Sequence, residues 1–254
     1  MPPQSWLVSL TWIRAHPEGL LTRAVIHLGA HKSMSRKAFD IDQALASIEK
    51  AVKPWPKAAM FELAEAGYNT PFEQLAACMI SIRTYDEVTI PTARKLFERA
   101  RTPAQISEMS ADEIDALIQS CTFHERKAGQ ILGIARRVLD EYGGKLPCDN
   151  EIMQSFPGVG PKCAHLVLGV ACQEPYISVD VHVHRVTNRW GYVRASSPER
   201  TMVALEETLP KRHWIDINRL LVPFGKHICT GKLPKCSVCP VLEMCNQVGV
   251  TSHR

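Results

Sequence analysis

The chain has 254 residues, of which 45% are hydrophobic and 22% are charged, a composition typical of soluble globular proteins. This length is enough for one large hydrophobic core or two modest ones. No apolar run approaches the roughly 18–20 residues that a membrane helix needs, so we expect no membrane partner. The formal net charge of +4 comes from residues 1–37, which hold five basic residues and one acidic residue, and the rest of the chain is balanced. Charge alone therefore does not predict a nucleic-acid partner.

The composition of residues 1–37 differs from that of the rest of the chain. They are poor in acidic residues and place Trp6 and Trp12 among basic side chains. We expect an N-terminal extension, and three interpretations stay open for it. It is a disordered segment, a targeting peptide of mitochondrial type, or the product of a start codon assigned too early.

Hydrophobic residues recur at helical spacing along most of the remaining chain, and strand patterns are almost absent. The first such segment, residues 41–52, stops before Pro54 and Pro56. Thr70-Pro71-Phe72-Glu73 has the pattern of a capping box with proline at the first helical position, and Ser110-Ala111-Asp112-Glu113 repeats the capping pattern. The sequence therefore predicts an all-α fold.

The second half of the chain continues this pattern. A helix over residues 128–142 is expected to end at the left-handed Gly143-Gly144 pair. Asp149 is expected to cap a short helix that ends at Phe156, and Ser197-Pro198 to open a helix toward Leu209. A last long helix is expected from about Lys211 to Ile228, with a kink at Pro223.

The stretch Phe156-Pro157-Gly158-Val159-Gly160-Pro161-Lys162-Cys163-Ala164 predicts a helix, a glycine hairpin and a second helix. Gly158 and Gly160 permit positive φ and let a phosphate approach the backbone amides around Val159. Pro161 suits the first position of the second helix, so Lys162 lies in its first turn, at the positive end of the macrodipole. That environment favours the uncharged amine, which makes Lys162 a candidate nucleophile. The alternative is a surface lysine after an ordinary turn.

Asp180 lies in the segment Val179-Asp180-Val181-His182, just before a further helical pattern. Its simplest role is the N-cap of that helix, where aspartate is favoured.

Nine cysteines fall into two sets. Cys229, Cys236, Cys239 and Cys245 have the spacing C-x6-C-x2-C-x5-C, which is typical of metal ligands. General spacing rules do not choose between zinc and an iron–sulfur cluster. The other five are scattered, and we expect them to be free thiols in a reducing compartment, mostly as small buried apolar residues. They are Cys78, Cys121, Cys148, Cys163 and Cys172.

The hairpin stretch, the V-D-V-H-V-H-R-V segment and the four late cysteines together closely resemble the endonuclease III branch of the helix-hairpin-helix DNA glycosylases. The resemblance runs from about Thr70 to Cys245, and the motifs keep the order found in that family. It implies a helical bundle domain of residues 67–174 with the helix-hairpin-helix at about 149–171. It also implies a second domain, formed by residues 38–66 and 175–254, in which the four late cysteines hold a [4Fe-4S] cluster of structural role.

The resemblance further implies a bifunctional DNA glycosylase and abasic-site lyase that removes oxidised pyrimidines and cuts the strand 3′ to the lesion by β-elimination. Lys162 is then the nucleophile and Asp180 supports base departure. The amides of Gly158, Val159 and Gly160 would grip a phosphate, and the hairpin would hold a monovalent cation. The expected partner is double-stranded DNA with damaged bases or abasic sites, bound in the cleft between the two domains by a monomer. The compartment would be the bacterial cytoplasm and nucleoid, or the eukaryotic nucleus or mitochondrion.

Three positions depart from the usual family pattern. Arg83 replaces a glutamine that fills the gap left by the flipped base, and an arginine can pair with a guanine edge or stack on a base. Phe123 occupies the position of the opposite wedge, where it either inserts between bases or packs in the core. Val181 removes a hydroxyl beside Asp180. Further DNA contacts are expected from His182, Lys232 and Lys235, with ordinary solvated charge as the alternative for the two lysines.

Two other functions remain open. The chain could be a family member specialised for abasic sites or another lesion, with weak glycosylase activity. It could also be a DNA-binding or redox-sensing relative without catalysis, although the presence of both Lys162 and Asp180 argues against that alternative.

Overall fold

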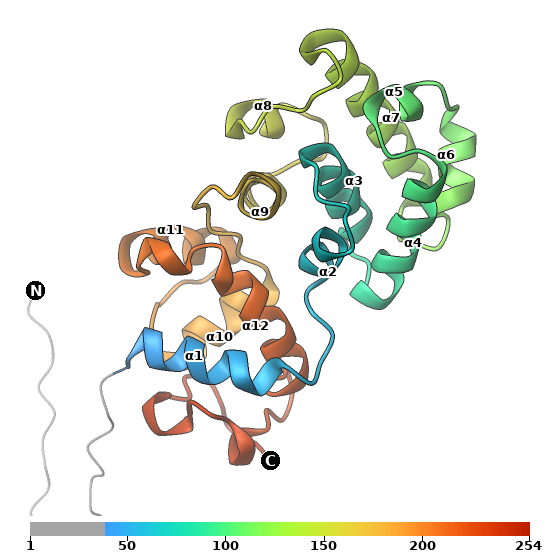
Figure 1. Cartoon of the computed structure of the whole chain (residues 1–254). Helices are drawn as coiled ribbons and strands as arrows, with labels where there is room; N and C mark the ends of the chain where they lie inside the picture. The colour runs from blue at the N-terminus through green and yellow to red at the C-terminus, as the bar shows by residue number, and fades with distance from the viewer. Residues whose placement is uncertain (1–38) are drawn as a thin grey trace, which may run out of the picture. The chain divides into compact units, whose positions relative to one another are not determined.

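The computed structural model describes residues 39–254, so the expectation for residues 1–37 lies outside it. Within the described part every regular element is a helix, which confirms the all-α prediction (Figure 1). In chain order the elements are α1 (Ile41–Val52), α2 (Ala59–Glu65), α3 (Pro71–Ser81), α4 (Asp86–Arg99), α5 (Pro103–Ser107), α6 (Ala111–Ile118), α7 (His124–Tyr142), α8 (Asn150–Gln154), α9 (Pro161–Cys172), α10 (Val181–Trp190), α11 (Pro198–Thr208), η1 (Lys211–His213), α12 (Asp216–His227), η2 (Cys236–Val238) and η3 (Leu242–Met244).

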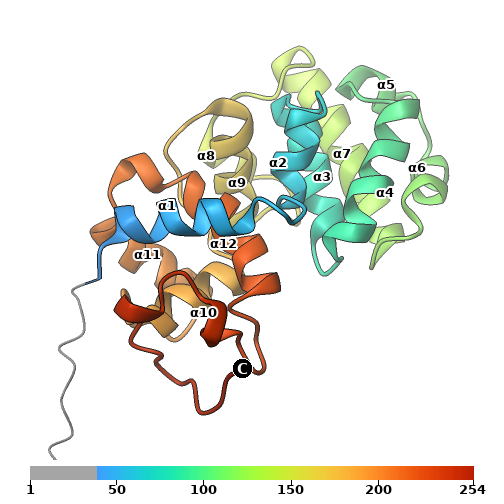
Figure 2. The same cartoon turned by 60° about the horizontal axis from the view of Figure 1, so that its bottom comes forward.

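Two hydrophobic cores organise these helices. The first gathers side chains from α2 to α9 and includes Leu75 and Ile131. The second combines α1 with α10, α11 and α12, and includes Ile48, Trp190 and Phe224. The described residues 39–254 nevertheless belong to one compact unit, and α1 packs along α12 although most of the chain separates them (Figures 1 and 2).

The first core begins earlier in the chain than the expected domain division. Helix α2 packs on α3, α4 and α9, so residues 59–65 contribute to the core of the bundle and not to the second core. Helix α1 alone among the elements before α3 belongs to the second core. The division into a bundle domain and a cluster domain otherwise stays a prediction.

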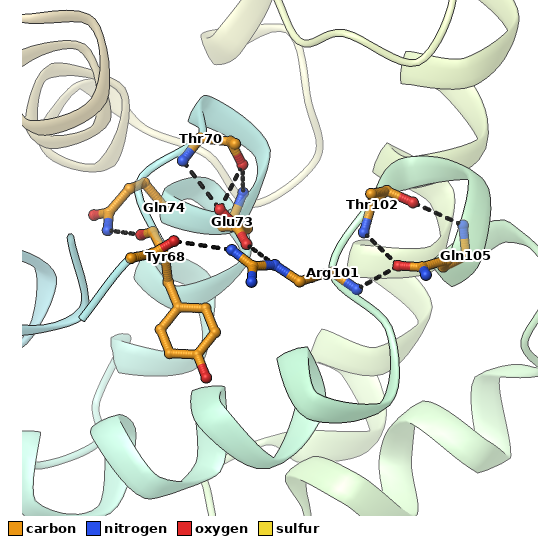
Figure 3. Close-up of polar contacts among 8 residues, drawn as sticks. Tyr68, Thr70, Glu73, Gln74, Arg101, Thr102 and Gln105 are labelled. Atoms are coloured by element: carbon orange, nitrogen blue, oxygen red, sulfur yellow. Dashed lines mark hydrogen bonds and ion pairs between the residues drawn. The ribbon is translucent and has the colours of Figure 1, made fainter. Parts of the chain in front are cut away.

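The start of α3 is fixed by a polar network around the buried Glu73 (Figure 3). The predicted capping box is present, because the Glu73 carboxylate accepts from the Thr70 N–H at 3.0 Å while Thr70 Oγ1 accepts from the Glu73 N–H. Arg101 Nε donates to Glu73 Oε1 at 2.7 Å, which pairs a carboxylate whose side chain is only 1% exposed. A second capping box, formed by Thr102 and Gln105, opens α5 beside it. This network fixes the position of α3 and therefore of the loop that follows Ser81.

Other helix boundaries agree with the sequence in most places. Gly143 is the left-handed C-cap of α7, with φ of +59°. The last long helix is shorter than expected, since residues 211–213 form the separate turn η1 and α12 begins only at Asp216. Pro223 does lie inside α12.

The expectation of free thiols is wrong for two cysteines. Cys148, just before α8, and Cys172, the last residue of α9, form a disulfide with their Cα atoms 5.9 Å apart. The sequence did not show this because the two residues come together only when α8 and α9 fold back on each other. Cys78, Cys121 and Cys163 are free and buried, as expected. The disulfide therefore closes a loop of chain that contains the whole helix-hairpin-helix.

Candidate active site

The helix-hairpin-helix is built from α8, the turn at residues 156–160, and α9. Gly158 has φ of +88°, a left-handed conformation that favours glycine, and Pro161 is the first residue of α9. The Val159 N–H donates to the Phe156 carbonyl at 3.1 Å. Within residues 39–254 no hydrogen bond uses the N–H of Gly158 or Gly160, so those two amides are open to an anion.

Lys162 is the second residue of α9 and is exposed. In the described part of the chain its side chain has neither a hydrogen bond nor an ion pair, so no carboxylate holds the amine. Its carbonyl accepts a hydrogen bond from Ser178 Oγ at 3.0 Å. The Ser178 carbonyl accepts in turn from Asn218 Nδ2 of α12 at 3.3 Å. Sequence analysis missed Ser178 and Asn218, two buried polar residues that tie the start of α9 to the second core.

Asp180 is the N-cap of α10, as predicted. Its Oδ1 accepts from the backbone N–H of His182 and of Val183, each at 2.9 Å. Its other oxygen takes part in no hydrogen bond within residues 39–254. One oxygen therefore fixes the helix start and the other is available to a ligand.

Lys162 and Asp180 line the same cavity, whose volume is about 390 Å³. The remaining lining residues come from the stretch between the end of α3 and the start of α4, from the residue before Asp180, and from α10, α11 and α12. They are Ser81, Thr84, Tyr85, Asp86, Val179, Val181, His182, Pro198, Glu199, Val222 and Lys226. A smaller cavity of about 50 Å³ is also lined by Lys162 and Asp180, together with Asp86 and Asn218. An amine without a partner and a carboxylate thus face one opening large enough for a nucleotide base.

His182 lines the cavity in a half-buried position. Burial lowers the pKa of its imidazole, and the neighbouring Arg185 and Lys226 act in the same direction while Asp180 opposes them. Arg185 Nη2 lies 3.1 Å from His182 Nδ1 and can donate to it. The neutral ring is therefore the favoured form near neutral pH, so His182 offers polar contacts and not a positive charge.

Arg83 and Phe123 do not reach that cavity but line a different one of about 310 Å³. Both have left-handed backbones, with φ of +55° and +58°, and the guanidinium carbon of Arg83 lies 5.7 Å from the centre of the Phe123 ring. Phe123 is 57% exposed, which excludes the core position considered from the sequence. Sequence analysis missed two further lining residues, Arg126 and Gln130, because nothing in their spacing marks them.

The four late cysteines all line one small cavity beneath Trp190 and Phe224 of the second core. Among residues 39–254 no group of three potential ligands converges on a single metal ion. Burial, and to a lesser degree the neighbouring cysteines, raises the pKa of Cys239 to about 12, so its thiolate needs a positive partner. Four cysteine sulfurs on one cavity are a donor set that suits a zinc ion or an iron–sulfur cluster.

Arginines of α10 hold the loop that carries the first of these cysteines. Arg189 Nη1 donates to the Thr230 carbonyl at 2.6 Å and lies 3.5 Å from Cys229 Sγ. Arg185 Nε donates to the Cys229 carbonyl at 3.1 Å. Lys235 lines the cysteine cavity and is half-buried, while Lys232 is exposed. The helix that Asp180 caps is thus bonded directly to the cysteine loop.

An all-helical scaffold with a glycine hairpin, open amides, and an amine and a carboxylate facing one cavity defines the helix-hairpin-helix class of DNA-processing enzymes. Residues 76–211 match the family described as HhH-GPD superfamily base excision DNA repair protein. Endonuclease III of Thermotoga maritima is 38% identical over 175 residues, which cover 69% of this chain and 82% of the relative. Endonuclease III of Bacillus subtilis is 31% identical over 187 residues, which cover 72% of this chain and 84% of the relative.

The solved structures agree with these matches. The structure of a trapped endonuclease III–DNA covalent intermediate has a TM-score of 0.71 and 30% sequence identity, covering 82% of this chain and 94% of the other. A non-covalent endonuclease III–DNA complex has the same TM-score at 29% identity. The chain belongs to the endonuclease III family, as the sequence motifs predicted. It is a DNA glycosylase of base excision repair, in a family for which abasic-site lyase activity is typical.

Proposed function

We propose that this enzyme removes oxidised pyrimidines from double-stranded DNA and then cuts the strand 3′ to the abasic site, with Lys162 as the nucleophile and Asp180 as the supporting carboxylate. The observation that carries this proposal is the cavity of about 390 Å³ that both residues line. The unpaired amine of Lys162 supports the nucleophilic role, since an ion pair would hold the amine in its charged form.

The first step requires the damaged nucleotide to leave the duplex, at a cost of a few kcal/mol that is smaller where pairing is already poor. The Lys162 amine then forms a bond to C1′ while the bond from C1′ to the base breaks, and the base leaves with a proton. Positive charge develops on the sugar during this step. The free oxygen of Asp180 stabilises it, and the other oxygen stays bonded to the start of α10.

The second step is β-elimination. The C1′–O4′ bond opens to give a Schiff base between Lys162 and C1′, a proton is lost from C2′, and the bond from C3′ to the 3′ phosphate breaks. Water then hydrolyses the Schiff base and restores the amine. Both steps use the same lysine, so glycosylase and lyase activity depend on one side chain.

The hairpin would hold the DNA backbone through the open amides of Gly158 and Gly160, without reading sequence. A monovalent cation held by backbone carbonyls of the hairpin stays a prediction, and Gly158, Val159 and Gly160 add no side-chain oxygen to such a site. Contacts of His182, Lys232 and Lys235 with DNA are also predictions.

Cys229, Cys236, Cys239 and Cys245 would hold the [4Fe-4S] cluster expected from the family. The cluster would cross-link the C-terminal loop to the second core, and neither chemical step uses an electron from it. We expect the protein to act as a monomer on DNA in the compartment that holds the genome. None of the helices in the described part of the chain is both long and apolar enough to cross a membrane.

A panel of duplexes with single lesions tests this proposal. Each contains dihydrouracil, thymine glycol, 5-hydroxycytosine or a preformed abasic site, and base release and strand cutting are measured separately. The proposal expects release of the three oxidised or reduced pyrimidines and cutting at all four sites. Cutting at the abasic site without release of any base would instead favour the alternative function, that of a family member specialised for abasic sites.

A further inference from the structure

We propose that the Cys148–Cys172 pair is a redox modification site, which exchanges with dithiols and small disulfides and thereby adjusts how tightly the hairpin binds DNA. This inference rests on one part of the proposed function, namely that the hairpin amides hold the DNA backbone. It adds a control of binding that neither the catalytic residues nor the cysteine cavity supplies.

The place where the protein is proposed to act argues that the bond is reversible. An enzyme that repairs the genome works in a compartment where small thiols and dithiol proteins keep most cysteines reduced, and disulfides found there are mostly transient. The bond is also open to attack, since Cys148 is exposed and Cys172 is half-buried. The free cysteines Cys78, Cys121 and Cys163 are buried and lack this access.

Reduction takes two exchange steps. One thiolate of the dithiol attacks the Cys148 sulfur, and the Cys172 sulfur leaves with the electron pair of the broken bond and takes up a proton. The second thiolate of the dithiol then attacks the first, closes the dithiol into a disulfide and releases Cys148 as the second thiol. Oxidation runs in reverse, with a small disulfide such as oxidised glutathione taking up the two electrons.

The bond joins the two ends of the helix-hairpin-helix. Cys148 lies just before the N-cap of α8, and Cys172 is the last residue of α9. Helix α8 packs on α9, but among residues 39–254 no hydrogen bond or ion pair joins the two helices. In this part of the chain, reduction therefore leaves side-chain packing as the link between them.

Helix α8 depends on outside contacts, because it has only 5 residues and so short a helix is not stable alone. Its C-terminal end is held by α7, since Arg137 Nη1 donates to Ser155 Oγ at 2.9 Å and the Arg137 guanidinium carbon lies 4.8 Å from the centre of the Phe156 ring. The disulfide is the covalent hold on its N-terminal end. When that hold is released, the hairpin amides of Gly158 and Gly160 move with the helix that precedes them.

Lys162 is anchored separately from α8. Its carbonyl accepts from Ser178 Oγ, and α9 packs on α2 and α3 in the first core. The amine should therefore stay in the cavity that it shares with Asp180. Reduction should weaken the binding of DNA and leave the covalent step at saturating DNA nearly unchanged. Oxidising conditions, under which oxidised pyrimidines also arise, should strengthen the binding.

Binding measured across a series of glutathione buffers tests this inference on the full-length protein with its metal site loaded. The probe is a labelled duplex with a tetrahydrofuran residue, an abasic-site analogue that cannot form a Schiff base, and fluorescence anisotropy gives its affinity. Reduction should weaken the binding by at least about fivefold, because a hairpin that is no longer preorganised must be ordered on binding. Alkylation of free thiols and peptide mass analysis should show the Cys148–Cys172 bond opening over the same range of buffers.

Two variants control the measurement. The protein with both Cys148→Ser and Cys172→Ser should bind with the affinity of the reduced wild type in every buffer. Cys121→Ser, at a buried free cysteine, should respond as the wild type does. Borohydride trapping of the wild type on saturating abasic DNA should change by less than about twofold on reduction.

Three results would overturn the inference. They are equal affinities of the oxidised and reduced wild type, an affinity of the double-serine variant that still follows the buffer, and a Cys148–Cys172 bond that forms in none of the buffers. Failure of the proposed function looks different, since borohydride trapping would then be absent in both redox states.

Discussion

The Nζ atom of Lys226, near the end of α12, lies 3.0 Å from Oδ2 of Asp86, the first residue of α4. It also lies 3.0 Å from Oε1 of Glu87. Among residues 39–254 these are the ion pairs that connect the second core to the first. Asp86 and Lys226 both line the cavity of Lys162 and Asp180. The ion pairs thus hold together the two walls between which the damaged base is proposed to enter.

Replacing Lys226 with methionine should lower the free energy of unfolding by about 1 kcal/mol at neutral pH, as expected for a partly buried ion pair. Burial lowers the pKa of Lys226, but Asp86 and Glu87 outweigh it and raise the pKa above the ordinary 10.5. The backbone N–H of Glu87 and the ammonium of Lys226 lower the pKa of the Glu87 carboxyl below 4.5.

The sign of the pH effect follows from these shifts. The contribution of Lys226 is complete below pH 10.5 and is lost as the pH rises through its raised pKa. That of Glu87 is complete above pH 4.5 and is lost as the pH falls through its lowered pKa. Urea unfolding of both proteins should show a constant difference between about pH 5 and 9 that shrinks below pH 4.5. A difference that grows in acid would contradict the pairing.

Gly158→Ala should weaken binding to abasic DNA by about tenfold or more. A Cβ at Gly158 would lie 2.5 Å from Gln130 Nε2, and φ of +88° is strained for alanine, so the hairpin must shift and its amides with it. Gly160→Ala is the matched control, because a Cβ there meets nothing within 4 Å and its φ of −104° suits any residue. Fluorescence anisotropy with one labelled duplex measures both variants. Equal affinities for the two would show that the conformation of the hairpin is not what binds the phosphate.

Reduction of the Cys148–Cys172 disulfide should lower the free energy of unfolding by about 2–4 kcal/mol. The bond closes a loop across a sequence separation of 24 residues, and opening that loop gives entropy back to the unfolded chain. Thermal unfolding with and without a reductant measures the effect. The variant with both cysteines changed to serine should unfold at the lower temperature in both conditions. If the reductant still lowered its unfolding temperature, the effect would come from elsewhere in the protein.

Local signals made most of the fold predictable. Thr70, Ser110 and Asp149 cap helices as expected because a cap depends on residues three positions apart. The disulfide and the membership of α2 in the first core were not predictable in this way. Both depend on which helices pack together over long sequence separations, and helical periodicity carries no information about that.

If the proposed [4Fe-4S] cluster is bound, Cys239→Ser should remove most of its colour and iron and destabilise the second core. The cysteine cavity lies against Trp190 and Phe224 of that core, so losing a ligand removes a cross-link between the C-terminal loop and α12. Visible absorption with iron and sulfide analysis measures the loss. Cys121→Ser, at a buried free cysteine outside the cavity, should keep the colour. A colourless wild-type protein with stoichiometric zinc would contradict the cluster assignment.

The candidate site was predictable to the extent that motifs carried it. Lys162 and Asp180 were found because each lies at a helix start with a recognisable sequence. Ser178 donates to the carbonyl of Lys162 and Asn218 of α12 donates to the carbonyl of Ser178, and neither residue has such a pattern. Likewise Arg126 and Gln130 became visible only when the structure placed them in one cavity with Arg83.

The central claim is that the Lys162 amine forms a covalent bond with the sugar. Borohydride reduces a Schiff base to a stable amine, so the wild-type enzyme incubated with abasic DNA and borohydride should give a cross-linked product. Lys145→Ala, at an exposed lysine in the segment between α7 and α8, should do the same. Lys162→Ala should give no cross-link and lose strand cutting by at least about 1,000-fold. A cross-link of undiminished yield in Lys162→Ala would contradict the account.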